Sequence, residues 1–303
     1  MENKKWPRLS FEEGKETYET IHLWTQILGK IKLETLPWIN HSWHVTLYVS
    51  PSGLTTGNLP AEKKNFQIDL DLVDHRLNIL TSKKEERTFS LLDLSVAEFY
   101  HKLMEDLKKL EIDVEIRKIP NELVDPIAFD EDNTHATYIP KVALAFQRAL
   151  LEINKVFTSF RAEFIGKSSP VHFYWGSFDL AVGRFSGRKA PMHPGGIPNL
   201  PDRVAREAYS HEISSCGFWP GNESVPFAAF YSYIYPEPSG FSSASIKPQA
   251  AYYHKELGEF ILPYSEVQKA EDPEKELLEF LRSTYEAAAD LAKWNSKELE
   301  KPE

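Results

Sequence analysis

The sequence predicts an α+β fold with two related halves, each built of mostly antiparallel strands and flanking helices. Three observations lead to this prediction. Apolar residues recur at three- and four-residue intervals in several long segments, as they do in amphipathic helices. Shorter segments alternate apolar and polar residues, as half-buried strands do. The order of these elements is similar on the two sides of a polar connection.

The first half is predicted to begin with a helix over residues 13–32, in which Tyr18, Trp24 and Leu28 belong to one apolar face. A second helix is predicted to begin after Ser95. Glu98 stands three residues later, and this spacing is typical of a capping box. Strands are expected in this half at 43–49, 66–72, 77–79 and 114–116.

The second half is predicted to begin with a long helix from Pro140 to about Phe164. Its last helix is capped by Asp272, with Pro273 at the first helical position. The segment 227–235 is apolar on both faces and is expected to be a central strand. Strands are expected in this half near 171–182, 207–216, 227–235 and 258–262.

The connection is rich in Asp and Asn, so we divide the chain into a first half at 1–120, a connection at 121–138 and a second half at 139–303. The repeated order is compatible with internal duplication and equally with coincidence, because Gln26–Lys30 only loosely resembles Phe164–Lys167. If the halves are related, a pseudo-two-fold axis would bring their polar strands together. A cleft is then expected at their seam.

Composition restricts the classes of protein to which the chain can belong. Its 303 residues are 42% hydrophobic and carry a formal net charge of −10. An acidic chain repels phosphate backbones, so nucleic-acid binding is not expected. The sequence has neither a membrane-length apolar run nor the apolar core of a secretion signal. The single cysteine, Cys216, agrees with a cytoplasmic location and excludes an internal disulfide.

The segment 166–196 is the most probable place for function, because aromatic and titratable residues occur there at strand spacing. His172 and Tyr174 fall on one face of a strand, and Trp175 falls on the other. Asp179 follows a Gly-Ser turn. We predict that His172 or His211 acts as a general acid and base in a cleft, with Asp179 orienting the imidazole.

A second prediction is an anion site in the same cleft. Arg184 and Arg188 follow the aromatic strand closely, and guanidinium groups pair well with carboxylates and phosphates. A solvated charged turn is the alternative. The loop that contains His193 either holds this side chain over a pocket or simply connects two elements. The full set of predicted ligand-binding residues is Trp43, His44, Lys167, Tyr174, Trp175, Arg184, Arg188 and His193.

The sequence names no cofactor. A metal site made of His44, His172 and His211 is conceivable, but hydrogen-bonded core histidines are the commoner outcome, so no metal ligand is predicted. Phosphate loops, dinucleotide-binding glycine patterns and nucleophile elbows are absent from the sequence. The ligand is therefore expected to be a small molecule. If the arginines bind it, it should be an anion. The sequence does not fix the oligomeric state.

A set of local motifs resembles one bacterial family, known only as a domain of unknown function, DUF5996. The resemblance covers nearly the whole chain and implies a full-length module in a bacterial, cytosolic protein, but it implies no activity, ligand or catalytic residue. The motifs are Gly29–Ile31, Asn40–Val45, Asp74–Leu77, Gly166–Phe173, Trp175–Leu180, Arg184–Arg188 and Ser210–Glu212.

Three functions agree with these observations. The first is a small-molecule enzyme that uses the His/Asp acid–base cleft and the arginine-lined anion site. The second is a non-catalytic module that binds a small anionic or aromatic ligand, with Trp43, Tyr174 and Trp175 stacking on it. The third is a partner-binding protein that uses the strand at 227–235 as its interface. We expect the first of these functions.

Overall fold

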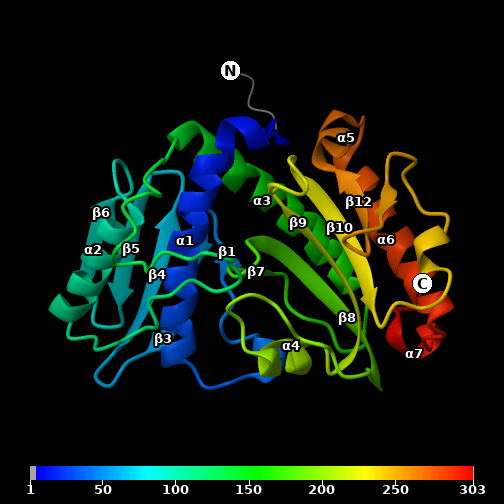
Figure 1. The fold of residues 1–303 in the computed structure, drawn as a ribbon, viewed down its shortest axis with the longest axis horizontal. Coiled ribbons are helices and arrows are strands. Elements are labelled where there is room, and N and C mark those ends of the chain that lie inside the picture. The colour runs from blue at the N-terminus through cyan, green and yellow to red at the C-terminus, as the bar shows by residue number, and fades with distance from the viewer. Residues whose placement is uncertain (1–4, 303) are drawn as a thin grey trace.

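A computed structural model describes residues 5–302, which form two antiparallel sheets beside each other (Figure 1). Residues 1–4, part of the N-terminal stretch in which no secretion signal is predicted, lie outside this range. The first sheet has the strand order β1-β2-β4-β5-β6, and β3 pairs with β4. The first half contains α1 (Phe11–Thr35), η1 (Asn40–Ser42), β1 (Tyr48–Val49), β2 (Gly53–Thr55), β3 (Leu59–Pro60), β4 (Asn65–Asp71), β5 (Arg76–Thr81), β6 (Glu86–Ser90) and α2 (Val96–Lys109).

The second sheet has the order β11-β12-β10-β9-β8-β7, so β10 is an interior strand, as predicted for 227–235. Helices α3 and α6 pack against this sheet. The prediction of an α+β fold with two similar halves is confirmed. The second half contains α3 (Pro140–Ala162), β7 (His172–Tyr174), β8 (Asp179–Lys189), α4 (Asp202–Ala208), β9 (His211–Trp219), β10 (Ala229–Tyr235), η2 (Phe241–Ser243), β11 (Tyr252–His254), β12 (Glu259–Pro263), α5 (Tyr264–Lys269), α6 (Pro273–Leu291) and α7 (Ser296–Leu299).

The two sheets meet at one antiparallel bridge between Leu47 and Phe173. The amide of Leu47 donates to the carbonyl of Phe173 over 2.9 Å, and the amide of Phe173 donates back to the carbonyl of Leu47 over 2.8 Å. This reciprocal pattern is that of a hydrogen-bonded residue pair in an antiparallel ladder. Each of the long helices α1 and α3 precedes its half of the bridge, and the two helices pack against each other.

One large hydrophobic core extends through both halves, from Trp6 to Trp294, and contains Trp24, Phe146 and Phe230 among its largest side chains. A small second cluster surrounds Tyr231. Residues 111–139, between α2 and α3, contain no helix or strand. This stretch includes the predicted connection, but the core is shared across it. The division into separate parts at 120 and 139 therefore stays a prediction.

The two predicted helix starts that rest on N-cap residues are confirmed. The side chain of Ser95 accepts from the amide of Glu98, and the carboxylate of Glu98 accepts from the amide of Ser95. Asp272 caps α6, with Pro273 at the first helical position. Satisfying the free amides at a helix start stabilises it by about 1 kcal/mol per cap.

Three element predictions are wrong. Only the end of the strand predicted at 43–49 forms, as the bridge at Leu47 and β1, while 43–46 are irregular after η1, in which His41 and Ser42 adopt positive φ values of 59° and 55°. The stretch 207–216 is split between the end of α4 and β9. Residues 114–116 are irregular. The resemblance of Gly29 to Gly166 has no structural counterpart, since Gly29 lies inside α1 and Gly166 lies after the end of α3.

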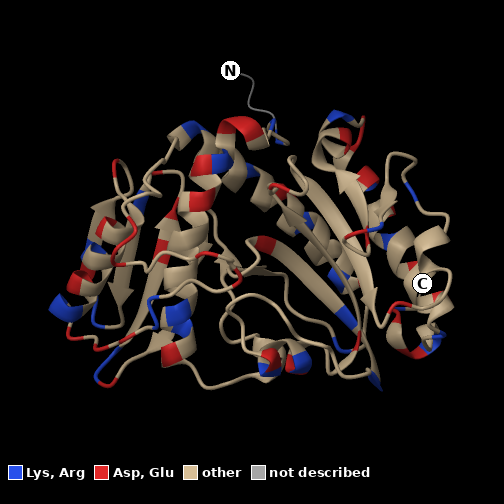
Figure 2. Cartoon of the chain, viewed as in Figure 1, with Lys and Arg blue, Asp and Glu red and all other residues tan. Residues whose placement is uncertain are grey.

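Charged residues of both signs are interspersed over both halves in the view of Figure 2. No helix among residues 5–302 combines the length and the apolar character needed to cross a lipid bilayer.

Candidate functional site

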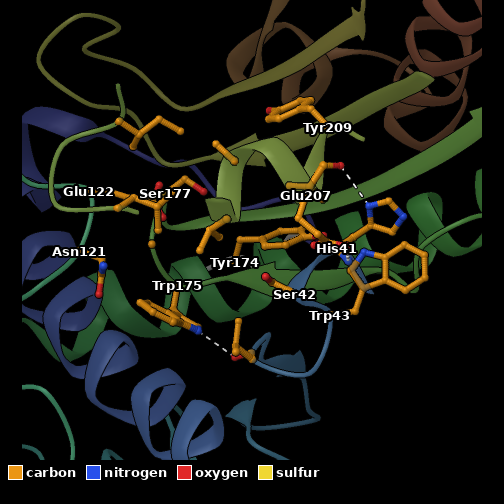
Figure 3. Close-up of a pocket in the computed structure, with 18 of the residues that line it drawn as sticks. His41, Ser42, Trp43, Asn121, Glu122, Tyr174, Trp175, Ser177, Glu207 and Tyr209 are labelled. Carbon is orange, nitrogen blue, oxygen red and sulfur yellow. Dashed lines mark hydrogen bonds between the residues drawn. The ribbon is translucent and has the colours of Figure 1, made fainter. Parts of the chain in front are cut away.

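A cavity of about 700 Å³ lies where the two halves meet, and we term it the seam cavity (Figure 3). Alternate residues of β8, with β9 and β10, form its floor on the sheet face opposite to α3. The segment 197–209, which contains α4, lies over this floor, while 38–45 and 117–122 contribute walls. Residues from both halves and from the connection therefore surround one internal space.

Aromatic side chains make up much of this lining: Trp38, Trp43, Tyr174, Trp175, Phe185, Tyr209, Tyr231 and Tyr233. Trp175 is held firmly, because its indole N–H donates to the carbonyl of Val45 over 2.8 Å. Its ring lies directly on α1 at Gly29, where a Cβ atom would overlap with it. Trp38 is 63% exposed, an unusual fraction for a tryptophan. Flat apolar surface is thus available to a ligand inside the cavity.

Asp179 is the most deeply buried acidic group of the lining, with 5% of its surface exposed. The hydroxyl of Ser177 donates to Oδ1 over 2.5 Å, and the hydroxyl of Tyr231 donates to Oδ2. Burial raises the pKa of Asp179, and these two hydrogen bonds oppose the rise. The carboxyl group is therefore oriented by two hydroxyls and has no cationic neighbour bonded to it.

Glu122 is a second acid of the lining and comes from the connection. Its backbone adopts φ = 63°, which is uncommon for a residue with a side chain. Burial and the nearby charge of Asp179 raise the pKa of Glu122 to about 7. The same two causes raise the pKa of Glu259, at the start of β12, to about 8. Asp179 therefore repels two other acids: Glu122, which lines the cavity, and Glu259, which does not.

The position of Glu122 is fixed by the residue before it. The amide of Asn121 donates to Oε1 of Gln26 over 2.8 Å, and the side-chain nitrogen of Gln26 donates back to the carbonyl of Asn121 over 2.9 Å. The side-chain amide of Asn121 donates to the carbonyl of Asn199 over 2.6 Å. Helix α1 and the segment 197–209 thus hold the connection from two sides. In Figure 3, Asn121 and Glu122 lie together at one end of the view.

Three lysine or arginine residues also line the cavity: Lys30, Arg117 and the exposed Arg203 of α4. The ammonium group of Lys30, on α1, donates to the side-chain oxygen of Asn121. Burial first, and then the nearby Arg117, lower the pKa of Lys30 to about 8. Arg117 is exposed at the cavity and belongs to the irregular stretch after α2.

The other end of the cavity carries Glu207 and His41, which Figure 3 shows beside Trp43. Oε1 of Glu207 accepts from the amide of His41 over 2.7 Å. Oε2 of Glu207 is buried and has no hydrogen-bond partner among the described residues. His44 also lines the cavity, and its Nδ1 accepts from the amide of Ile39 over 3.2 Å, which leaves the proton of a neutral ring on Nε2.

The structure does not bring the predicted catalytic residues together. Only Asp179 lines the seam cavity. His172 is 0% exposed and lies behind Tyr174, where its Nδ1 is 2.7 Å from the hydroxyl of Thr46. Burial lowers the pKa of His172 to about 3, so the ring stays neutral. His211 lies outside the lining, with its Nδ1 bonded to Ser210 over 3.1 Å.

The two arginines of β8 that were predicted to bind an anion do not line the seam cavity. Arg184 is 2% exposed, lies on the helical side of the sheet and stacks on Phe160 and Tyr285. Its guanidinium donates to the carbonyl of Phe160. Arg188 forms a 2.6 Å ion pair with Glu212. Both arginines have internal partners and neither lines the seam cavity, so an arginine-lined anion site stays a prediction to which this cavity lends no support.

Four of the predicted ligand-binding residues do line the cavity: Trp43, His44, Tyr174 and Trp175. Lys167 lies behind this wall, with its ammonium group 5.4 Å from the ring of Trp43 and 2.8 Å from Nε2 of His41. His193 stacks on Tyr209 at 4.7 Å between ring centres. Lys167 and His193 therefore support lining residues but do not line the cavity.

Sequence reasoning missed several lining residues: Lys30, His41, Arg117, Asn121, Glu122, Glu207, Tyr209, Tyr231 and Tyr233. A signal existed for Tyr231 and Tyr233, which alternate along one face of β10. None existed for Glu122, because it lies in irregular chain. Within residues 5–302, no three His, Cys, Asp or Glu side chains gather closely enough to hold a metal ion.

Comparison with known proteins adds a family and no activity. No curated protein and no solved structure matches the chain significantly. A family model described as a family of unknown function, DUF5996, matches residues 6–301, which is essentially the full length and agrees with the motif resemblance. The chain therefore belongs to the DUF5996 family.

Proposed function

We propose that the protein binds a small organic cation, a protonated amine on an aromatic body, in the seam cavity. One observation carries this proposal. Asp179 and Glu122 line an aromatic cavity, and neither forms an ion pair with any described lysine, arginine or histidine within 4.0 Å. A ligand that brings a positive charge would supply the missing partner.

The electrostatic argument concerns the cost of charge without a counterion. A buried carboxylate that lacks a cationic neighbour is destabilised relative to water, and a second carboxylate nearby increases that cost. An ammonium group placed between Asp179 and Glu122 reduces both contributions. An anionic ligand at this end would increase them.

The lining rings supply the second part of the argument. Tyr174, Tyr209 and Trp175 present flat faces and hydroxyl or N–H edges, which suit a planar ligand body. Aromatic faces also attract cations, by about 0.5–2 kcal/mol per contact. A charged amine on an aromatic body therefore complements both the acids and the rings.

From the sequence, a non-catalytic module that binds an anionic or aromatic ligand is an alternative to the enzyme. We keep the binding role but make the ligand a cation. Trp43, Tyr174 and Trp175 remain the proposed stacking residues. The anion partners Arg184 and Arg188 are replaced by the carboxyl groups of Asp179 and Glu122. His172 and His211 have no part in it, because neither lines the cavity.

Proton transfer to or from the ligand is a second candidate function, and one observation favours it. Glu122 lines the cavity, its carboxyl group has no hydrogen-bond partner among residues 5–302, and its pKa of about 7 suits a general acid or base at neutral pH. Calorimetry of tryptamine binding near pH 7 in buffers of different ionisation enthalpy tests this role. Wild-type protein is expected to release a proton when the ammonium group binds, whereas the Glu122→Gln variant is not.

Calorimetry with a matched pair of indoles tests the binding proposal. Tryptamine carries the ammonium group, and tryptophol replaces it with a hydroxyl. We expect wild-type protein to bind tryptamine at least tenfold more tightly than tryptophol, and Asp179→Asn and Glu122→Gln to lose this preference. Glu62→Gln, an exposed carboxyl change outside the lining, is the control and keeps it. Equal affinity of wild-type protein for both indoles would contradict the proposal.

A further inference from the structure

We infer that the ligand of the seam cavity carries an anionic group beside its amine, and that Lys30 and Arg117 hold this group. The ligand class is then a small aromatic zwitterion, such as an aromatic amino acid. The inference rests on the proposed function, because it assigns the amine of the same ligand to Glu122 and Asp179.

Lys30 is the first observation. It is 3% exposed, yet its ammonium group bonds only to the neutral side-chain oxygen of Asn121. An ammonium group has three N–H donors, so two remain for another partner. The ring of Trp175 lies 6.0 Å from the same nitrogen. A buried lysine without an anionic partner is uncommon, and this one lines a cavity.

Arg117 is the second, independent observation. It lies close enough to Lys30 to lower the pKa of that lysine, so two positive charges adjoin the same part of the cavity. Neither forms an ion pair with a described carboxylate within 4.0 Å. The exposed Glu34 lies one helical turn after Lys30 and attracts it only at longer range. Two adjacent cations without an anion form a site for a carboxylate.

The third observation is the separation of the charges. Lys30 and Glu122 line the same cavity and have opposite charges, yet they form no ion pair. Asn121 lies between them: it accepts from Lys30 and directly precedes Glu122 in the chain. The bonds of Asn121 to Gln26 hold this arrangement in place. Positive and negative groups that line one cavity without pairing with each other suit a ligand that carries both an ammonium and a carboxylate group, as an α-amino acid does.

A purely structural role of Lys30 is the competing account. In that account the ammonium group serves only to hold Asn121, and solvent screens its charge. Both accounts predict that loss of Lys30 lowers the stability of the protein. They differ in one measurable respect, since only the ligand role predicts that Lys30 distinguishes ligands with a carboxylate from ligands without one.

The experiment measures the affinity of three indoles by calorimetry: L-tryptophan, tryptamine and indole-3-propionate. Wild-type protein is compared with Lys30→Met and Arg117→Met. Lys102→Met, which removes an exposed lysine of α2, is the control for charge. Thermal unfolding of each variant shows that it is folded under the conditions of the titration.

We expect wild-type protein to bind L-tryptophan at least tenfold more tightly than tryptamine. Lys30→Met and Arg117→Met are expected to reduce this ratio towards one while leaving the affinity for tryptamine within about twofold, and Lys102→Met to keep the full ratio. Equal affinity of wild-type protein for tryptophan and tryptamine overturns the inference and leaves the amine proposal standing. Binding of indole-3-propionate without binding of tryptamine overturns the amine proposal and supports the anion site. No binding of any of the three overturns both.

Discussion

The carboxyl group of Glu122 packs onto the Cα atom of Gly176, where a Cβ atom would overlap with Oε1. The carbonyl of the same glycine accepts from Nε2 of His22 over 2.9 Å. The turn between β7 and β8 is therefore held by α1 on one side and carries the connection on the other. This contact places an acid from irregular chain next to Asp179 at the start of β8.

Replacing Gly176 with alanine is expected to displace the carboxyl group of Glu122 from the cavity. The affinity for tryptamine should then fall about as far as it does in Glu122→Gln, because both changes remove the same charge from the site. A crystal structure of the variant locates the carboxyl group. Unchanged tryptamine affinity together with a displaced Glu122 would show that this acid has no role in binding.

The pH dependence of stability tests the burial of Glu122. The folded state keeps its proton up to about pH 7, whereas the unfolded chain loses it near the ordinary value of 4.5, so ionisation lowers the stability of the fold as pH rises through this interval. Glu122→Gln should therefore gain stability relative to wild-type protein from pH 4.5 to 7, by on the order of 1–3 kcal/mol at pH 8. Urea unfolding of both proteins at pH 5 and pH 8 measures this difference.

The comparison with Glu122→Gln is needed because two buried histidines change the stability of the wild-type protein with pH in the direction opposite to Glu122. Burial lowers the pKa of His22 to about 4 and that of His172 to about 3. The stability that these neutral rings contribute is present above pH 6.5 and is lost as pH falls towards those values. Both proteins contain them, so their contribution cancels. A stability difference that stays constant from pH 5 to pH 8 would show that Glu122 is ionised normally.

Gly29→Ala tests how firmly Trp175 is seated. Alanine in place of glycine inside a helix ordinarily stabilises a protein by about 0.5–1 kcal/mol. Here the new methyl group overlaps with the indole of Trp175, so we expect a loss of about 1–3 kcal/mol instead. The loss should be smaller in a Trp175→Phe background, because the overlapping nitrogen is then absent. Denaturant unfolding of the four proteins in this cycle gives the coupling, and equal losses in both backgrounds would exclude it.

Thr46→Val tests the contact between the halves. The hydroxyl of Thr46 and Nδ1 of His172 are 2.7 Å apart, and both residues are fully buried. Valine has a similar shape but leaves the ring nitrogen unpaired, at a cost of about 1–3 kcal/mol. Since neither residue lines the cavity, the affinity for tryptamine should not change. A loss of affinity larger than threefold would place His172 in the site.

The fold was predictable where local chemistry determines it. The capping box at Ser95 and Glu98, and the alternating apolar residues of β4, are properties of short segments. The first part of the strand predicted at 43–49 is missing for a tertiary reason. His41 adopts positive φ with its amide bonded to Glu207, a residue far along the chain. Such a contact leaves no periodic signal in the sequence.

One error about the site was avoidable, and another was not. Arg184 is five positions after Asp179 on β8, and an odd offset along a strand places two side chains on opposite sides of the sheet. Strand periodicity alone therefore excludes them from one cavity. Glu122 could not be predicted, because its position depends on hydrogen bonds between Asn121 and Gln26 across the fold.

A crystal structure of the protein with tryptamine tests the central claim most directly. The account predicts tryptamine in the seam cavity, with its indole against the aromatic lining and its ammonium nitrogen within hydrogen-bonding distance, about 2.7–3.2 Å, of a carboxyl oxygen of Glu122 or Asp179. An ammonium group directed away from both acids, or a cavity that stays empty at saturating tryptamine, would contradict it.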